Sequence, residues 1–166
     1  MSEIARFHLR APGLADADAI AEVHLTTWHA TYAHLLPDCH FDNNALEQRK
    51  AMWRFTLSSK QPPQRLRVAE AHGGIVGFEY AGTPLDDEDP ARDLQLYTLY
   101  LLPEHQGTGA GQALLDAVLA ENHAQLWVAK DNPRARSFYR RNGFVPDGSE
   151  KICPGTTDLV EVRLVR

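Results

Sequence analysis

Three glycines at alternate positions form the segment of this sequence best suited to holding a charged ligand. They lie in Gln106-Gly107-Thr108-Gly109-Ala110-Gly111, between the apolar run 94–102 and a stretch in which apolar residues recur at helical spacing. The first turn of a helix has backbone N–H groups without partners, and the helix dipole makes that end positive. Because glycines carry no side chain, an anion can approach those donors closely. The segment therefore predicts a cradle of backbone amides for an anion such as a phosphate.

Two common nucleotide-binding motifs do not match this spacing. A P-loop requires Lys followed by Ser or Thr after the last glycine, whereas Gln112-Ala113 follow here. A dinucleotide-binding turn requires a third glycine at position 112 and a preceding βαβ half, whereas this turn lies late in the chain. A tight strand-to-helix turn without a ligand is the remaining alternative, although each glycine inside regular structure costs about 0.5–1 kcal/mol.

Apolar patterns along the rest of the chain predict the elements that must position this cradle. A nearly continuous apolar run such as 94–102 is typical of a central strand buried on both faces. Asp16 and Asn132 are placed to cap helices, and His72-Gly73-Gly74 forms a tight turn between two strands. We expect one domain over 1–166, of the α/β (α+β) class, with a mixed sheet flanked by helices. Strands are predicted in 5–12, 66–71, 75–82, 94–102, 124–130, 144–155 and 157–166, and helices in 14–37, 43–59, 110–118 and 132–143.

Composition restricts the class of protein and its partners. Hydrophobic residues make up 43% and charged residues 23% of the 166 residues, as in ordinary globular domains. The net charge of −5 and the lack of a Lys/Arg run argue against a nucleic-acid partner. Cys39 and Cys153 are far apart and are expected to be reduced thiols, and no apolar run is long enough for a membrane span. We therefore expect a cytoplasmic protein with no nucleic-acid or membrane partner.

Two stretches of the chain resemble one known family. LYTLYLLPEHQGTGAGQALL (96–115) resembles the acyl-CoA-binding motif of the GNAT superfamily of N-acetyltransferases. That motif is Gln or Arg, two residues, Gly, one residue, then Gly or Ala, which Gln106, Gly109 and Gly111 fill. VAKDNPRARSFYRRNGF (128–144) is similar to the strand and helix that follow in the family. The resemblance implies a GNAT-like fold with a mostly antiparallel sheet and about four helices, and acetyl-CoA as co-substrate without a metal.

The resemblance also implies which residues hold the co-substrate. Leu99 to Leu101 would pair with the pantetheine arm, and Leu101 N–H would polarise the thioester carbonyl as an oxyanion donor. Asn132 and Tyr139 would also contact the cofactor. The pyrophosphate would be held by the backbone amides of Gln106, Gly107, Thr108, Gly109, Ala110 and Gly111.

Acyl transfer to an amine requires an acid and a base. A free alkylamine has a pKa of about 10.4, so a base must take its proton, and the leaving thiolate must receive one. Tyr139 matches the family's general acid by its position in SFYRRNGF, and a core aromatic beside Phe138 is the alternative. Many relatives carry Glu where this chain has Gln95, which cannot accept a proton. Glu79 is the substitute base, directly or through water, unless it faces solvent on its strand.

Aromatic residues are the candidates for the acceptor pocket. Tyr97 shares a strand face with Gln95 and Leu99 by period-2 alternation, so it could line that pocket. Trp28 and Tyr32 lie on the helical segment that walls the acceptor site in the family. There they could hold an ammonium through cation–π contacts, and a role in the core is the alternative.

These residues predict transfer of an acetyl group from acetyl-CoA to a primary amine of a small molecule or protein by direct attack. A non-catalytic acyl-CoA-binding or sensing module is the alternative, which Gln95 keeps open, and nicotinamide-dependent redox chemistry is a third class. The acidic segment 83–93 is either a solvated loop or draws in a cationic acceptor. No metal site is expected, because His24, His29 and His34 are dispersed around a helix. Relatives are often homodimers, and no residue of this chain identifies an interface.

Overall fold

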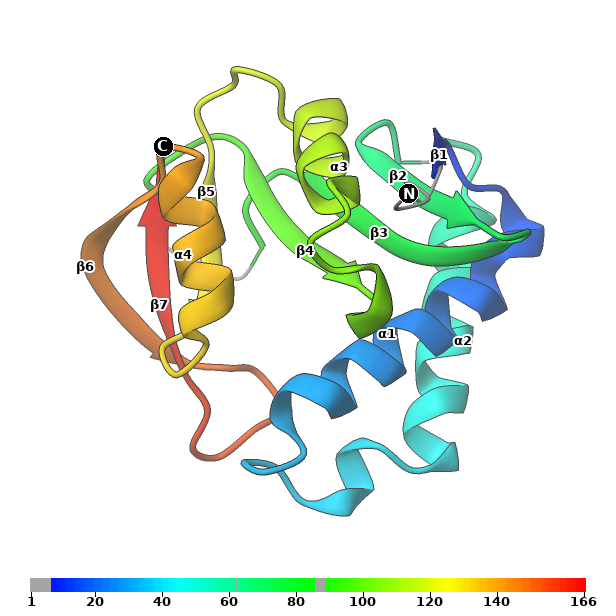
Figure 1. The fold of residues 1–166 in the computed structure, drawn as a ribbon. Coiled ribbons are helices and arrows are strands. Elements are labelled where there is room, and N and C mark those ends of the chain that lie inside the picture. Colours follow the sequence, from blue (N-terminus) through cyan, green and yellow to red (C-terminus); the bar gives the residue numbers. More distant parts are fainter. Residues whose placement is uncertain (1–6, 62, 86–88) are drawn as a thin grey trace, which may run out of the picture. The chain divides into compact units, whose positions relative to one another are not determined.

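The chain folds around one sheet of seven strands in the order β1-β2-β3-β4-β5-β7-β6 (Figure 1). The computed structural model describes residues 7–61, 63–85 and 89–166. β4 and β5 are parallel, whereas the β1–β2, β2–β3, β5–β7 and β6–β7 pairs are antiparallel, so the mixed, mostly antiparallel sheet is confirmed. The elements follow the predicted order: β1 His8–Arg10, α1 Ala17–Tyr32, α2 Asn43–Leu57, β2 Leu66–Ala71, β3 Gly74–Gly82, β4 Gln95–Leu101, α3 Ala110–Val118, β5 Gln125–Ala129, α4 Pro133–Arg141, β6 Val145–Ile152 and β7 Val160–Val165.

Two compact units make up the chain. The first, here the N-terminal unit, contains the residues up to Tyr80 together with Thr98–Ala120. The second, here the C-terminal unit, contains Ala81–Tyr97 together with Glu121–Arg166. The division passes through β3 and β4, each of which gives residues to both units.

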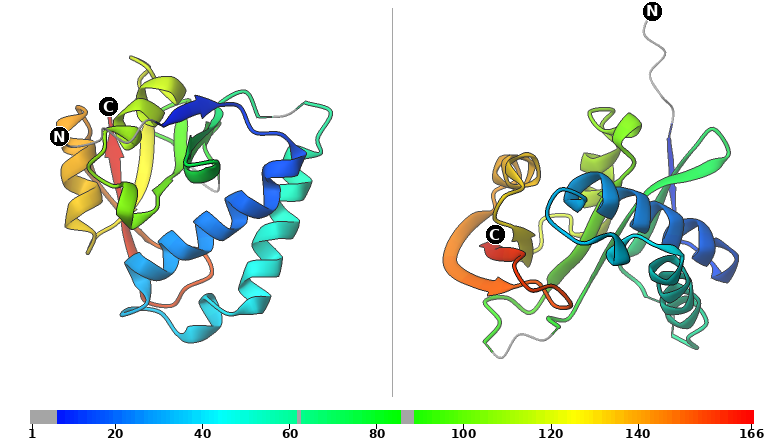
Figure 2. Two further views of the ribbon diagram at one scale, coloured as in Figure 1. Left: turned by 45° about the vertical axis from the view of Figure 1, so that its right-hand side comes forward. Right: turned by 90° about the horizontal axis from the view of Figure 1, so that it is seen from below.

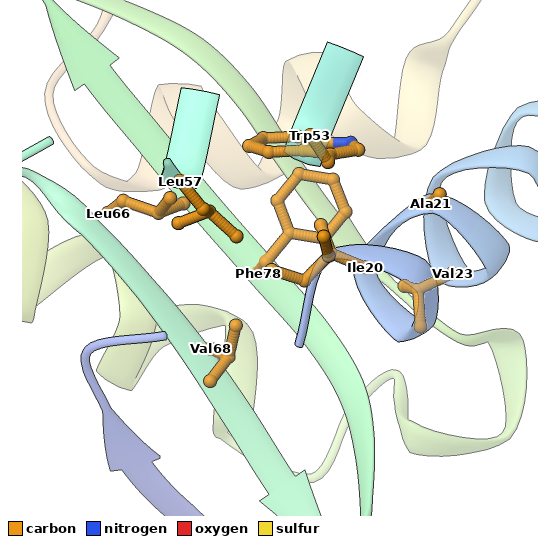
Figure 3. Packing of buried hydrophobic residues seen from close by; sticks show 9 residues of the cluster. Ile20, Ala21, Val23, Trp53, Leu57, Leu66, Val68 and Phe78 are labelled. Carbon is orange, nitrogen blue, oxygen red and sulfur yellow. The ribbon is translucent and has the colours of Figure 1, made fainter. Parts of the chain in front are cut away.

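In the N-terminal unit, α1 and α2 pack against one face of β2 and β3 (Figures 1 and 2). Ile20 of α1, Trp53 of α2 and Phe78 of β3 meet in an apolar cluster, in which the rings of Trp53 and Phe78 lie 5.1 Å apart (Figure 3). Val68 of β2 is the register partner of Phe78 and belongs to the same cluster. Burying each such side chain stabilises the fold by about 1.5–3 kcal/mol, which fixes both helices on this face.

The side chains of β4 in this unit alternate between the two faces of the sheet, as strand geometry requires. Tyr100 packs with the cluster beneath α1 and α2. Leu99 and Leu101 instead pack with Ala69 of β2 and Leu114 of α3. The backbone of β4 therefore lies between two different sets of side chains.

One prediction for β4 is wrong. Gln95 and Leu96 are buried, but the five residues from Tyr97 to Leu101 are only partly buried, so the strand is not covered on both faces along its length. The two buried residues are those in register with Gln125 and Leu126 of β5. Burial is thus complete where the parallel pairing supplies a neighbour and partial beyond it.

The C-terminal unit is built on β7, which pairs with both β5 and β6. α4 begins at Pro133, and Asn132 caps it by accepting a hydrogen bond from the N–H of Ala135 at 3.1 Å. Gly143, with φ of +84°, lies just beyond the end of the helix in the left-handed conformation that glycine favours. The predicted cap and stop of this helix are both confirmed.

The long helix predicted over 14–37 is shorter than expected. It begins as a 3-10 turn, Leu14–Asp16, and α1 ends at Tyr32, five residues before Pro37. Asp16 stands at the expected cap position, but its carboxylate instead accepts from the N–H of Gly13 at 2.8 Å and pairs with Arg10 at 2.8 Å. Over the described residues, no helix has both the length and the apolar character needed to cross a bilayer.

Candidate functional site

The loop between β4 and α3 holds its glycines in conformations that other residues rarely adopt. After a 3-10 turn, Pro103–His105, Gly107 has φ of +80° and Gly109 has φ of +90°. A Cβ atom at either glycine would meet no other atom within 4 Å. These glycines are therefore required by the backbone path, and the volume beside them is open instead of filled by protein. Open volume beside the start of a helix is what an anion cradle requires.

Backbone donors gather at the beginning of α3. Because the helix starts at Ala110, the N–H groups of its first turn have no carbonyl one turn earlier to receive them. The Ala110 N–H makes a long contact of 3.4 Å with Thr108 Oγ1, whose hydroxyl donates to the carbonyl of His105 at 2.7 Å. Thr108 thus orders the loop from within.

The backbone N–H and the side chain of Gln106 both make hydrogen bonds within the chain. Its N–H donates to the carbonyl of Pro103 at 3.2 Å, so this amide is already used by the chain. Its side-chain Nε2 donates to the carbonyl of Leu101 at 3.1 Å and ties the loop to the end of β4. The Gln106 amide is thus committed within the loop, and the pyrophosphate-binding role of residues 106–111 stays a prediction.

The backbone of β4 is held closely against β3 at this end. The Leu102 N–H donates to the carbonyl of Val76 at 2.8 Å. Since successive residues of a strand direct their N–H groups to opposite sides, the N–H of Leu101 points away from β3. A Cβ at Gly77 would lie 2.6 Å from Leu101 Cδ1 and 2.7 Å from the carbonyl oxygen of Tyr100, so the two strands approach closely only because residue 77 is glycine. The role of the Leu101 N–H as an oxyanion donor stays a prediction.

Glu79, the candidate base, is fully buried on β3. Its register partner on β2 is Arg67, and it lies on the face opposite Phe78 and the helices α1 and α2. The alternative that Glu79 faces solvent is therefore wrong, because this strand is covered on both faces at residue 79. Its role as a base stays a prediction.

Gln95 takes part in a buried pair of amides in the C-terminal unit. Its Oε1 accepts from Gln125 Nε2 at 3.1 Å. Gln125 Oε1 in turn accepts from the N–H groups of Ala91 at 2.6 Å and Arg92 at 3.1 Å. An amide at residue 95 thus helps to anchor the segment that leads into β4.

The other predicted residues of the C-terminal unit are packed against their neighbours. The ring of Tyr139 is buried, with centroids 5.4 Å from Phe138 and 5.8 Å from Phe144. The hydroxyl of Tyr97 donates to the carbonyl of Thr83, and its ring covers Gly82, where a Cβ would lie 2.5 Å from that hydroxyl. Both packing and a site role are compatible with these positions, so the acid role of Tyr139 and the pocket role of Tyr97 stay predictions.

On α1, Trp28 and Tyr32 are in edge-to-face contact, with ring centroids 4.4 Å apart. Tyr32 is buried and Trp28 partly so, which brings both into the packing of the helix. Their cation–π role toward an acceptor ammonium stays a prediction, because packing within the helix is compatible with it as well as with the core alternative.

Sequence reasoning assigned no site role to two basic residues of α1 and α2, His24 and Arg49. His24 stacks on Tyr100 at 5.2 Å and accepts a hydrogen bond at Nδ1 from Trp53 Nε1 at 3.3 Å. Burial lowers the pKa of His24 to about 3, so the ring is neutral. Arg49 of α2 is half-buried, and burial lowers its pKa. Helical spacing offered the signal: His24 precedes Trp28 by four residues, and Arg49 precedes Trp53 by four.

Known proteins match the chain over most of its length. Residues 62–146 match the acetyltransferase (GNAT) domain. The uncharacterized N-acetyltransferase YuaI of Bacillus subtilis is 29% identical over 162 residues, which cover 94% of this chain and 87% of YuaI. The uncharacterized N-acetyltransferase Rv2669 of Mycobacterium tuberculosis is 31% identical over 159 residues, which cover 90% of this chain and 98% of Rv2669.

Solved structures agree on the fold. The PaiA N-acetyltransferase of Thermoplasma acidophilum, crystallised with coenzyme A, superposes with a TM-score of 0.73 at 21% identity, covering 97% of this chain and 98% of PaiA. The chain belongs to the GNAT family of acetyltransferases, whose co-substrate is acetyl-CoA.

Proposed function

We propose that this protein transfers the acetyl group of acetyl-CoA to a primary amine of a small molecule or protein. The observation that carries the proposal is the open glycine loop, in which Gly107 and Gly109 adopt positive φ beside volume that no protein atom fills. The first-turn amides of α3 adjoin this volume and lack partners within the helix. Backbone donors at a helix start suit a pyrophosphate, which is one of the charged groups of coenzyme A.

The chain's own residues then have the following roles. The Leu101 N–H, directed away from β3, stabilises negative charge on the thioester oxygen as the amine attacks the carbonyl carbon. Glu79 accepts the amine proton, directly or through water. As the carbon–sulfur bond breaks, the hydroxyl of Tyr139 gives a proton to the departing thiolate. The products are an amide and coenzyme A with its free thiol.

Two observations bear on the alternative, a module that binds acyl-CoA without turnover. Gln95 stands where many relatives have an acid, and its amide is committed to Gln125. Against this, Glu79 places a carboxyl group on the neighbouring strand.

Free thiol released from acetyl-CoA across a panel of primary amines tests the proposal. We expect release with at least one class of amine, and a higher melting temperature with coenzyme A but not with NAD, since a ligand that binds only the folded state must stabilise it. Tight binding of coenzyme A without release on any amine would favour the non-catalytic module. A rise in melting temperature with NAD alone would refute the assignment of the glycine loop.

A further inference from the structure

Three side chains of the N-terminal unit carry buried polar atoms that have no hydrogen-bond partner among the described residues. They are Trp28 Nε1 on α1, Arg49 Nε on α2 and Thr98 Oγ1 on β4. The indole and guanidinium nitrogens are donors only, and the hydroxyl can also donate. A buried donor without an acceptor is destabilising, so proteins keep few of them unless a ligand supplies the acceptor. We call these three residues the donor cluster.

The three donors lie near the contacts that join α1, α2 and β4. His24 of α1 accepts a hydrogen bond from Trp53 of α2 and stacks on Tyr100 of β4, so these three elements meet there. Trp28 lies one helical turn after His24, and Thr98 lies two residues before Tyr100, each on the same face of its element as the residue in contact.

Arg49 lies one turn before Trp53 on α2 and completes the cluster. Its Nε is buried on the same helix face as Trp53, and Arg49 interacts electrostatically with His24 and Tyr100. Because α1 and α2 are joined through residues 33–42, the C-terminal end of α1 and the N-terminal end of α2 lie at the same end of the pair (Figures 1 and 2). Trp28 and Arg49 both lie nearer to that end than His24 and Trp53 do.

The donor cluster is positively charged. Arg49 Nη1 donates to the carbonyl of Ala45 at 3.1 Å, and no carboxylate pairs with Arg49 within the part of the chain that the structure describes. His24 is neutral with Nδ1 as acceptor, so Nε2 carries its proton and is a further donor. The site thus presents a positive charge and several N–H groups, and its unfilled positions require an acceptor.

We propose that the donor cluster binds a carboxylate of the acceptor substrate, so that the preferred amine is an aminocarboxylate and not a polyamine. This inference rests on the proposed acetyl transfer. With Nη1 committed to Ala45, the Nε edge of Arg49 is the side of the guanidinium that pairs with the two oxygens of a carboxylate. A second positive charge on the substrate would instead be repelled by Arg49.

The position of the donor cluster relates this carboxylate to the acyl group. Thr98 and Tyr100 alternate along β4 with Leu99 and Leu101, whose backbone is the predicted partner of the acyl arm. A substrate held by Thr98 and Arg49 on the helix side of β4 therefore lies beside the strand that presents the Leu101 N–H. For Trp28, it is the indole N–H and not the ring face that recognises the substrate.

Matched acceptors test the proposal by thiol release from acetyl-CoA. A series of aminocarboxylates is compared with their uncharged amides, with aminoalkyl phosphates and with diamines of equal length. We expect kcat/KM for the best aminocarboxylate to exceed that of its amide by about 10- to 100-fold, the effect of losing a charge-assisted contact. Faster turnover of the amide, the phosphate or the diamine would overturn the assignment of a carboxylate.

Variants connect this preference to the donor cluster. Arg49→Met should lower kcat/KM for the aminocarboxylate by at least about tenfold more than for its amide, which removes the preference. Thr98→Val, which keeps the packing volume, and Trp28→Phe, which keeps an aromatic ring but removes the N–H, should each reduce the preference by about three- to tenfold. Arg54→Met is the matched control, because Arg54 lies on the same helix but is exposed and paired with Asp18, and it should leave the preference unchanged. An equal loss for both acceptors in Arg49→Met would overturn the proposal.

Two measurements separate failure of this inference from failure of the proposed function. Arg49→Met should melt at or above the temperature of the wild type, because it removes a half-buried charge with which no carboxylate of the described residues pairs. If no amine releases thiol, acetyl transfer fails, and calorimetric titration of the aminocarboxylate into the protein with coenzyme A still tests the site. Binding that is lost in Arg49→Met supports the carboxylate site, and binding that is absent or unchanged in Arg49→Met refutes it.

Discussion

Replacing Gly109 by alanine tests whether the glycine loop holds coenzyme A. Gly109 has φ of +90°, and a Cβ there would meet no atom within 4 Å. The cost of Gly109→Ala is therefore backbone strain alone, about 1–2 kcal/mol for a residue with a side chain in the left-handed region. For a domain of this size that corresponds to a fall in melting temperature of about 2–8 °C.

Gly155 provides a matched control in another loop. It has φ of +80° and equally open surroundings, so Gly155→Ala should cost a similar amount of stability. Only Gly109→Ala, however, places a methyl group in the volume that we assign to the phosphates. We expect it to weaken binding of coenzyme A at least about tenfold, the loss of one charge-assisted hydrogen bond or more, whereas Gly155→Ala leaves affinity unchanged.

Isothermal titration with coenzyme A and thermal unfolding of both variants without ligand provide the measurement. We expect both variants to be destabilised equally but to differ in their affinity for coenzyme A. The shared loss of stability then reports the backbone strain, and the difference in affinity reports the ligand contact that only Gly109→Ala loses. If Gly109→Ala melts like Gly155→Ala yet binds coenzyme A within twofold of wild type, the glycines serve only the turn. The reasoning from open volume to phosphate binding would then be refuted.

Three further predictions concern the chemistry and the core. Tyr139→Phe should lower kcat by at least about 100-fold in the thiol assay with unchanged affinity for coenzyme A, and an unaltered kcat would leave Tyr139 as a packing residue. Glu79→Gln should lower kcat to a similar extent and remove the acidic limb of the pH–rate profile, and a retained limb would place the base elsewhere. Since His24 has a pKa of about 3 when folded and about 6.5 when unfolded, acidification from pH 6.5 toward 3 should reduce the free energy of unfolding by up to about 1.4 kcal/mol per pH unit through this residue. Urea unfolding of wild type and His24→Phe at several pH values checks it, because the variant should lack this part of the loss, and parallel pH dependences would contradict the burial of His24.

The order of elements could be predicted because local patterns specify most of them. The hairpin of β2 and β3 shows a change to period-2 spacing on both sides of His72-Gly73, and both turn residues adopt positive φ in the structure. The cap at Asn132 and the stop at Gly143 likewise depend on residues within a few positions of the helix ends. The end of α1 at Tyr32 was missed because polar and apolar residues continue at helical spacing up to Pro37.

Features that depend on how distant elements pack could not be predicted. Glu79 follows a phenylalanine on a strand and so resembles a solvent-facing residue, yet the sheet is covered on both faces there. Gln106 looks like a ligand residue by motif, but its amide and side chain are both used to shape the loop. Arg49 lies in an ordinary charged stretch of α2, and only the packing of two helices on β4 shows that part of it is buried.

The tight approach at Gly77 makes the reactivity of this protein adjustable from a position that touches neither substrate. A Cβ at residue 77 would lie 2.6 Å from Leu101 Cδ1 and 2.7 Å from the Tyr100 carbonyl oxygen, so the backbone of β3 or β4 would have to shift. Such a shift would alter the alignment of the Leu101 N–H, which we propose as the oxyanion donor. Natural variation in turnover among close homologues can therefore arise on β3, in the layer behind the reacting groups.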